Sequence, residues 1–376
     1  ERAKLCHPLM AMTALSAEPW KQPLVIGTVT AVGVAGLVRY LFASGATSGQ
    51  NLASFLALIP IIRGKDYRTF MESHRRCLAT GQTTRNFTQG VMNYYEIMSE
   101  VITTTCGPYW HFVPMHFGMS RAQSHEKFHR TITEFLGSKP RDRVLELGCG
   151  FGEMGRQVAK FSGSSVVGLT MADCEVAGAN ERIKAANLES LCTMVQGDYH
   201  DLPFEDQSFD QVFGVYTLKY SAALEKAVSE AARVLKPGGT FLSYEILVTD
   251  AYDESDPWHK YLVQNISDST CMPPLHSQDE FRGAAARAGL KPKMEEDVCE
   301  GARPWYTCFT RSGVHLFLLN PLLQPLIRLA ELLRIVPLGF TDFYSTCLFH
   351  PTTDFVRAGR LGIISGAIMM TWTKPQ

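Results

Sequence analysis

The stretch Val144–Gly155 reads VLELGCGFGEMG and decides the fold class of this chain. It begins as an apolar strand and then turns, through glycines at alternate positions, into a helical segment. Glycine at such a turn lets the backbone approach a ligand closely and adopt angles that other residues resist. The stretch therefore predicts a strand, a ligand-binding turn and a helix of a nucleotide-binding α/β fold.

One acidic residue indicates which class of ligand this turn binds. Glu146 lies two residues before Gly148, at the end of the strand, where its carboxylate can accept a hydrogen bond from a ligand's amino group. The spacing E-x-G-x-G-x-G, completed by Gly150 and Gly152, is that of an S-adenosylmethionine-binding loop. A sulfonium with an amino-acid tail needs a nearby carboxylate rather than a phosphate cradle. We therefore expect S-adenosylmethionine as the cofactor, with Cys149 also in contact with it, and no metal.

The region from Arg143 to Pro237 alternates short β-branched runs with helical stretches. This alternation predicts a doubly wound, mostly parallel sheet with helices on both faces. The expected strands are Val144–Leu147, Ser165–Leu169, Cys192–Gln196, Gln211–Val215 and Thr240–Tyr244.

The ends of the second and third strands carry the remaining expected cofactor contacts. The second strand ends at Thr170, where an acidic residue usually meets the ribose hydroxyls, so Asp173 or Glu175 is the nearest substitute. Asp198 follows the third strand and is expected beside the adenine amino group, with Tyr199 against the adenine ring.

The composition limits the partners. The 376 residues, with 45% hydrophobic and 19% charged side chains, describe a globular protein, and the formal charge of −1 gives no bulk attraction to nucleic acid. The ten cysteines form no CxxC pair, which favours reduced thiols and a cytosol-facing protein. His125 and His129 have helical i, i+4 spacing but no third metal ligand nearby, so we expect them on a solvated helix face. A homo-oligomer stays an open alternative.

Two apolar segments suggest contact with a membrane. Pro23–Ala43 predicts an N-terminal membrane anchor, with a signal peptide or a buried helix as alternatives. Gly313–Val336 is interrupted by Pro321 and Pro325, so we expect a cap over a pocket or a surface that dips into a membrane. The expected divisions are a membrane-associated segment at 1–63, a helical lead-in and lid at 64–130, the cofactor-binding core at 131–250 and a substrate region at 251–376.

Beyond the cofactor motifs, the chain from about Tyr94 to Gln376 resembles the sterol methyltransferases. Ser243–Glu245 after the fifth strand and the aromatic run Pro304–Tyr306 match the family. Thr353–Ile363 resembles the family's C-terminal region, which general small-molecule methyltransferases lack. The resemblance implies a Rossmann-like class I fold and C-methylation of a sterol at the endoplasmic reticulum membrane, with the catalytic domain facing the cytosol.

Two motifs depart from the members that methylate side-chain carbon 24. Their aromatic motif YEYGWGxSFHF reads TTTCGPYWHF at Thr103–Phe112, where the His-Phe end is kept and the acidic residue is lost. Their motif EATCHA reads YTLKYS at Tyr216–Ser221, so both its Glu and its His are replaced. The pattern is closer to the nematode-type members that methylate carbon 4 of the A ring, and both positions stay open.

The expected catalytic residues follow from these departures. Methylation at carbon 4 would proceed through an enol or enolate of a 3-oxo sterol, which Tyr216, Tyr220 or His111 could orient or deprotonate. Glu245 is retained from the family and is expected to touch the substrate or a developing cation. Alternatively, the two tyrosines only form part of the pocket wall, and His111 has a structural role. A methyltransferase for a quinone or tocopherol-type phenol, and a lipid-binding protein on a degenerate scaffold, are the competing functions.

Overall fold

The computed structural model describes residues 60–376, without 107–110, 311–318, 320 and 322. The predicted anchor Pro23–Ala43 and part of the apolar segment Gly313–Val336 lie outside the described residues. Within the described ranges, no helix combines the length and the apolar character needed to cross a bilayer.

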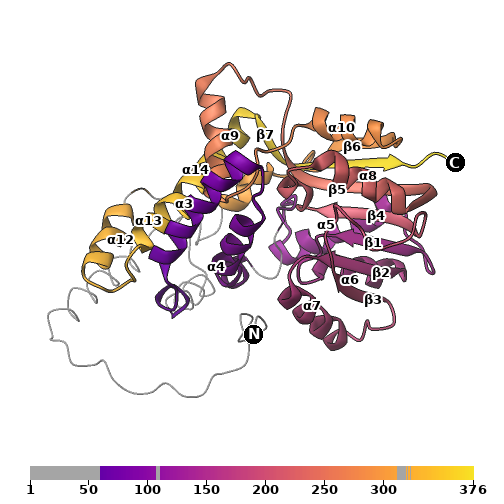
Figure 1. Ribbon diagram of the computed structural model, residues 1–376, viewed down its shortest axis with the longest axis horizontal. Helices are drawn as coiled ribbons and strands as arrows, with labels where there is room; N and C mark the ends of the chain where they lie inside the picture. Colours follow the sequence, from indigo (N-terminus) through magenta and orange to yellow (C-terminus); the bar gives the residue numbers. More distant parts are fainter. Residues whose placement is uncertain (1–59, 107–110, 311–318, 320, 322) are drawn as a thin grey trace. The chain divides into compact units, whose positions relative to one another are not determined.

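The described chain is organised around a seven-stranded sheet in the order β3-β2-β1-β4-β5-β7-β6 (Figure 1). The strands are β1 Arg143–Leu147, β2 Ser165–Thr170, β3 Cys192–Gln196, β4 Phe209–Val215, β5 Leu235–Val248, β6 Lys291–Asp297 and β7 Ile364–Thr373. The first five are parallel, whereas β7 lies antiparallel between β5 and β6. The predicted mostly parallel sheet is confirmed.

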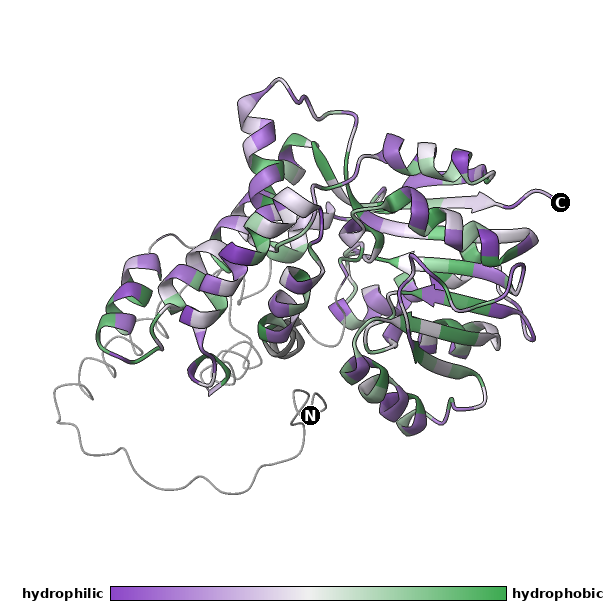
Figure 2. Cartoon of the chain, in the orientation of Figure 1, coloured by the Kyte–Doolittle hydropathy of each residue, from purple (hydrophilic) through white to green (hydrophobic). Residues whose placement is uncertain are grey.

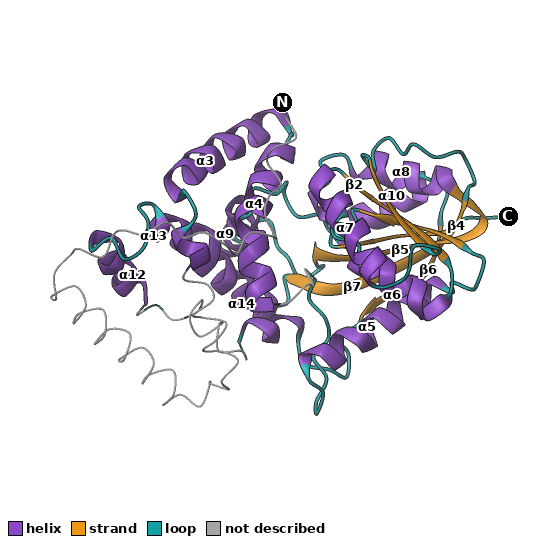
Figure 3. Cartoon of the chain, turned by 90° about the horizontal axis from the view of Figure 1, so that it is seen from below, coloured by secondary structure: helices purple, strands orange, loops and turns teal. Residues whose placement is uncertain are grey.

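Helices cover both faces of this sheet, as Figure 3 shows. One face carries α5 Arg121–Leu136, α6 Glu153–Ser162 and α7 Asp173–Ala185, and the other carries α8 Leu224–Val234 and α10 Gln278–Arg287. Successive side chains of a strand point to opposite faces, so Val144 joins the core under α5 and α6, and Leu145 joins the core under α8 and α10. Because both faces are covered, β5 is buried from Thr240 to Val248. Figure 2 shows green, hydrophobic segments in the interior of the sheet.

A second group of helices combines segments from before β1 with segments from after β5 (Figure 1). Its members are α3 Tyr67–Thr84, α4 Thr88–Cys106, α9 Pro257–Ser269, α12 Leu323–Leu332, α13 Phe340–Phe343 and α14 His350–Leu361. Helix α3 packs on α4 and α13, and its Tyr67 ring lies 5.0 Å from Phe340 and 4.7 Å from Phe343, between centroids. Helix α14 packs on α9, where the buried Asp354 accepts a hydrogen bond of 2.6 Å from Asn265.

The C-terminal region is not separate from the core. Strands β6 and β7 complete the sheet, although both lie after the boundary expected at residue 250. The segment resembling the family tail forms most of α14 and leads directly into β7. The same region therefore builds part of the helical group and closes the cofactor-binding sheet.

Candidate active site

The glycine loop after β1 is packed on two sides and open on a third. Gly148, Gly150 and Gly152 have φ angles of +62°, +51° and +69°, which favour glycine. A Cβ atom on Gly148 would overlap the side chain of Thr217, and one on Gly152 would lie 2.8 Å from Met194 Cε. A Cβ on Gly150 would meet nothing within 4 Å. Gly150 is therefore where a ligand can approach the loop backbone.

A backbone hydrogen bond of Cys149 holds this loop against the sheet. Its backbone N–H donates to the Leu169 carbonyl at 2.9 Å, and its own carbonyl accepts from the Gly152 N–H at 2.8 Å. Burial raises the pKa of the Cys149 thiol well above its ordinary value, so the side chain is a neutral part of the loop wall.

Glu146 lies beneath the loop and is 4% exposed. Its Oε2 accepts a hydrogen bond of 2.9 Å from the Gly155 N–H, one of the donors that the first turn of α6 cannot satisfy internally. Burial raises the pKa of Glu146 to about 8. A cation bound at the loop would favour the ionised form again, so the site is matched to a positively charged ligand such as a sulfonium with its ammonium tail.

The predicted ribose-binding residues meet at the end of β2. Thr170 Oγ1 donates to Glu175 Oε2 at 2.5 Å, and Glu175 lies in the first turn of α7. Asp173, the other substitute acid, is exposed. Burial raises the pKa of Glu175, because the carboxylate lies at the strand end rather than in solvent. Glu175 is therefore the acid that the fold places where a ribose would be met.

The loop after β3 contains a residue that the sequence motifs did not single out. Asp198 Oδ1 lies 2.7 Å from His200 Nδ1, and His200 Nε2 lies 2.7 Å from Ser221 Oγ. The hydroxyl of Tyr199 donates to the Thr217 carbonyl at 3.4 Å. These bonds fasten the expected adenine-binding residues to the loop after β4.

The loop after β4 begins at a strained residue. Tyr216 has a φ of +54°, which is rare for a bulky side chain and is held here by contacts with two other strands. Its N–H donates to the Tyr244 carbonyl at 2.8 Å, and its hydroxyl donates to the Gly366 carbonyl. Burial raises the pKa of Tyr216 well above 10. With its phenol proton already engaged, Tyr216 fits a wall better than a base.

Tyr220, at the end of the same loop, is bonded to the helical group. Its hydroxyl shares a short hydrogen bond with the hydroxyl of Tyr95 from α4, and the two rings lie 5.7 Å apart between centroids. Burial raises the pKa of both phenols. Tyr95 was not among the predicted residues, since nothing in the sequence pairs it with Tyr220.

Between these two tyrosines lies a buried lysine that the sequence analysis also missed. Lys219 is 4% exposed, and its Nζ donates to the Tyr216 carbonyl at 2.5 Å. The same nitrogen lies 4.8 Å from the centroid of the Tyr216 ring and 4.2 Å from that of Tyr220. Lysine is almost never fully buried without a partner. The only signal in the sequence was the Lys itself, in place of the Cys of EATCHA.

Glu245 supplies the negative charge near this lysine. It is 0% exposed, and its Oε1 accepts from the N–H groups of Thr217 and Leu218 at 3.0 and 2.7 Å. Burial raises the pKa of Glu245 and lowers the pKa of Lys219, and the opposite charge of each moderates the shift of the other. The predicted Glu245 on β5 and the unpredicted Lys219 on the loop that contacts Gly148 thus share one buried site.

The prediction that His125 and His129 lie on a solvated face is wrong. They are 2% and 1% exposed, because they share the inward stripe of α5 with Phe128 and Ile132 at helical spacing. His129 Nε2 lies 3.3 Å from the Nε2 of His111, the third predicted base. Burial lowers the pKa of all three imidazoles, which are therefore neutral at pH 7. In the described part of the chain, no His, Cys, Asp or Glu group is arranged to hold a metal.

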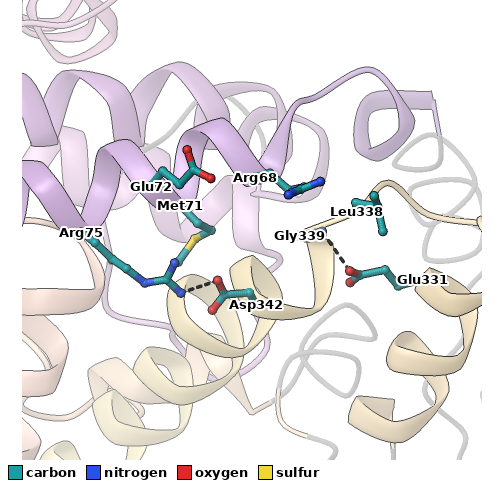
Figure 4. A pocket seen from close by; sticks show the side chains of 8 residues that line it. All are labelled: Arg68, Met71, Glu72, Arg75, Glu331, Leu338, Gly339 and Asp342. Carbon is teal, nitrogen blue, oxygen red and sulfur yellow. Dashed lines mark hydrogen bonds and ion pairs between the residues drawn. The ribbon is translucent and has the colours of Figure 1, made fainter.

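A pocket of about 330 Å³ lies away from these residues, where α3 meets the corner between α12 and α13 (Figure 4). Arg75 and Asp342 form an ion pair of 2.5 Å at this pocket, and Glu331 accepts a hydrogen bond of 2.9 Å from the Gly339 N–H. Its lining includes no residue of the glycine loop. Such a charged lining does not suit an apolar tetracycle.

Comparisons with known proteins agree with this site. Residues 145–243 match a family model described as a methyltransferase domain. Among solved structures, the [4+2]-cyclase SpnF has a TM-score of 0.58 at 19% identity, covering 77% of this chain and 96% of that one. Geranyl diphosphate methyltransferase in complex with SAM has a TM-score of 0.53 at 16% identity, covering 71% and 98%. At these identities the likeness shows the fold alone.

Sequence relatives are more specific. The chain is 33% identical over 326 residues to the sterol 4-C-methyltransferase strm-1 of Caenorhabditis elegans, covering 86% of this chain and 97% of that protein. It is 31% identical over 265 residues to the sterol 24-C-methyltransferase ERG6 of Saccharomyces cerevisiae, covering 70% and 68%. Together with the class I fold and the cofactor loop, these relatives show that the chain belongs to the sterol C-methyltransferase family, enzymes that use S-adenosylmethionine as the methyl donor.

Proposed function

We infer that this chain methylates carbon 4 in the A ring of a 3-oxo sterol. The observation that carries this proposal is the buried ammonium of Lys219, which lies over the rings of Tyr216 and Tyr220. Alkylation of a side-chain alkene would leave a carbocation, which needs aromatic faces and carboxylates around it. Here a cation already lies against the rings of Tyr216 and Tyr220.

The charge of Lys219 would affect a nearby reaction intermediate by several kcal/mol. Two like charges about 6 Å apart repel by about 3 kcal/mol at an effective dielectric constant of about 20. This repulsion would oppose a carbocation beside Lys219, whereas the same charge would stabilise the negative oxygen of an enolate by a similar amount. The likeness to strm-1, whose name gives 4-C-methylation, supports the same position.

The cofactor residues fit the methyl donor. When bound, S-adenosylmethionine supplies an electrophilic methyl group. Glu146 would meet its positive charge, Glu175 its ribose and Asp198 its adenine, while Gly150 leaves room beside the loop backbone. The loop that carries Lys219 contacts this site directly, because the side chain of Thr217 packs against Gly148.

The test uses the full chain, labelled S-adenosylmethionine and four acceptors: a 3-oxo sterol, the matching 3-hydroxy sterol, a side-chain alkene sterol and a phenolic lipid. Mass spectrometry of the purified product locates the added methyl group. We expect label on carbon 4 of the 3-oxo sterol. Label only on carbon 24 of the alkene sterol would refute the ring assignment, and label only on the phenolic lipid would favour the competing quinone- or tocopherol-type function.

We further propose that the enzyme works on the endoplasmic reticulum membrane, with its catalytic domain facing the cytosol. A sterol resides in the bilayer, and α12 exposes Leu329 at 47% and Leu332 at 73%. Eight cysteines are free thiols, which suits a reducing compartment. Flotation of the protein with lipid vesicles tests the membrane contact, and the double substitution Leu329→Ser and Leu332→Ser should reduce the floated fraction. An unchanged fraction would exclude α12 from that contact.

A further inference from the structure

One buried polar atom next to the cofactor loop has no hydrogen-bond partner among the described residues, and a buried ammonium beside it uses only one of its three donors. The Oε2 atom of Glu245 accepts no hydrogen bond from any described residue, although the residue is 0% exposed. The ammonium of Lys219 has three donors, and among the described residues only the Tyr216 carbonyl accepts from it. Buried polar atoms are nearly always satisfied, so atoms left open at a ligand site point to polar groups of the ligand.

We propose that Lys219 and Glu245 form the pair that enolises the substrate: Glu245 Oε2 removes the proton from carbon 4, and Lys219 Nζ stabilises the oxygen at carbon 3. This inference rests on the proposed function, since it requires a 3-oxo sterol. It makes Lys219 a catalytic residue and replaces the three bases that the sequence suggested, Tyr216, Tyr220 and His111.

The step balances without an added reagent. The C4–H bond breaks and its proton moves to the Glu245 carboxylate. The electron pair of that bond forms the C3=C4 double bond, and the carbonyl π electrons move to the oxygen, which becomes an enolate beside the ammonium. When bound, S-adenosylmethionine would supply the methyl group to the enolate carbon; its S–CH₃ bond would break with the electron pair kept by sulfur, and carbon 3 would become a carbonyl again. Glu245 returns its proton to solvent when the product leaves.

The surroundings of the pair suit this task. Glu245 Oε1 is held by the N–H groups of Thr217 and Leu218, so the carboxylate is oriented while Oε2 stays open. Burial raises the pKa of Glu245 toward the range in which a general base works well at neutral pH. The other candidates are engaged, because the Tyr216 hydroxyl donates to Gly366 and the Tyr220 hydroxyl is bonded to Tyr95.

The experiment measures enolisation without methyl transfer. The full chain is incubated in D₂O with S-adenosylhomocysteine and a 3-oxo sterol, and mass spectrometry follows deuterium entering carbon 4. We expect Lys219→Met and Glu245→Gln each to slow the exchange about 100-fold or more. Lys219→Arg keeps the charge and should retain part of the rate. Lys236→Met is the matched control, since Lys236 is half-exposed and bonded to Asp210 outside the site.

Folding is checked separately. Gln at position 245 still accepts from the two N–H groups of the loop, so we expect urea unfolding and S-adenosylhomocysteine binding close to those of the wild type. If Lys219→Met fails to fold, Glu245→Gln and Lys219→Arg still decide the question. Exchange at the wild-type rate in Glu245→Gln would overturn the inference while leaving carbon-4 methylation intact. If the wild type methylates no 3-oxo sterol, the proposed function itself fails.

Discussion

Replacing the glycines of the cofactor loop by alanine separates packing from ligand binding. Gly148 and Gly150 both have positive φ angles, so alanine at either position costs about 1–2 kcal/mol of backbone strain. At Gly148 the added methyl group also overlaps the Thr217 side chain, and such overpacking costs about 1–3 kcal/mol more. We therefore expect Gly148→Ala to lower the free energy of unfolding by about 2–5 kcal/mol, and Gly150→Ala by about 1–2 kcal/mol.

The affinity for S-adenosylmethionine should be reduced more by Gly150→Ala than by Gly148→Ala, although Gly150→Ala loses less stability. A Cβ at Gly150 meets no protein atom within 4 Å, so its methyl group would project into the space offered to the ligand. We expect Gly150→Ala to weaken S-adenosylmethionine binding about tenfold or more, which corresponds to about 1.4 kcal/mol. Gly289→Ala is the control, because Gly289 has a φ of +76° and equally open surroundings after α10.

Urea unfolding and calorimetric titration of the three variants provide the assay. Equal loss of stability in Gly148→Ala and Gly289→Ala would mean that the Thr217 contact is absent in solution. Unchanged donor binding in a folded Gly150→Ala would mean that the ligand does not approach the loop at this glycine.

Three further outcomes follow from the described contacts. Burial lowers the pKa of His125 and of His129 from 6.5 to about 4. Between these two pH values the unfolded chain therefore binds more protons than the folded chain. The free energy of unfolding is at its full value above pH 6.5 and falls as the pH is lowered from 6.5 to 4. The loss is about 3 kcal/mol per histidine, and urea midpoints that stay constant between pH 7.5 and 5 would contradict it. Glu175→Gln should weaken donor binding about tenfold, since a hydrogen bond to a charged acceptor contributes about 1.5–3 kcal/mol, and calorimetry with unaltered affinity would remove Glu175 from the ribose site. Arg75→Ala should change the free energy of unfolding by less than about 1 kcal/mol, because its ion pair with Asp342 is exposed; a larger loss in urea unfolding would show a buried role.

The parallel half of the fold could be predicted because its signals are local. The strands β1 to β5 are apolar, β-branched runs that follow or precede glycine turns, and each overlaps its expected range. Strand β6 gave no such signal. It reads KPKMEED and is largely exposed, as charged edge strands often are, so its sequence carries no alternating apolar pattern.

The site was less predictable because it is made by contacts between distant segments. The spacing of the glycine loop is sufficient to place Glu146 and Gly150 at the turn. The end of the second strand narrowed the ribose-binding acid to Asp173 or Glu175, and only the structure shows that Glu175 is the one bonded to Thr170. Lys219 is buried beside the rings of Tyr216 and Tyr220 and near Glu245 of β5, and lysine is ordinarily a surface residue. The burial of His125 and His129 was readable from the apolar stripe of α5, which carries Phe128 and Ile132 at the same spacing.

The position of β7 has a consequence for how the chain is made. Strand β5 pairs with β4 on one side and with β7 on the other, and β7 consists of residues near the C-terminus. A nascent chain that has completed β5 therefore presents an unpaired, apolar sheet edge to the cell until Ile364–Thr373 has been synthesised. During that interval the open edge of β5 can pair with other chains, because an exposed strand edge and apolar surface favour aggregation.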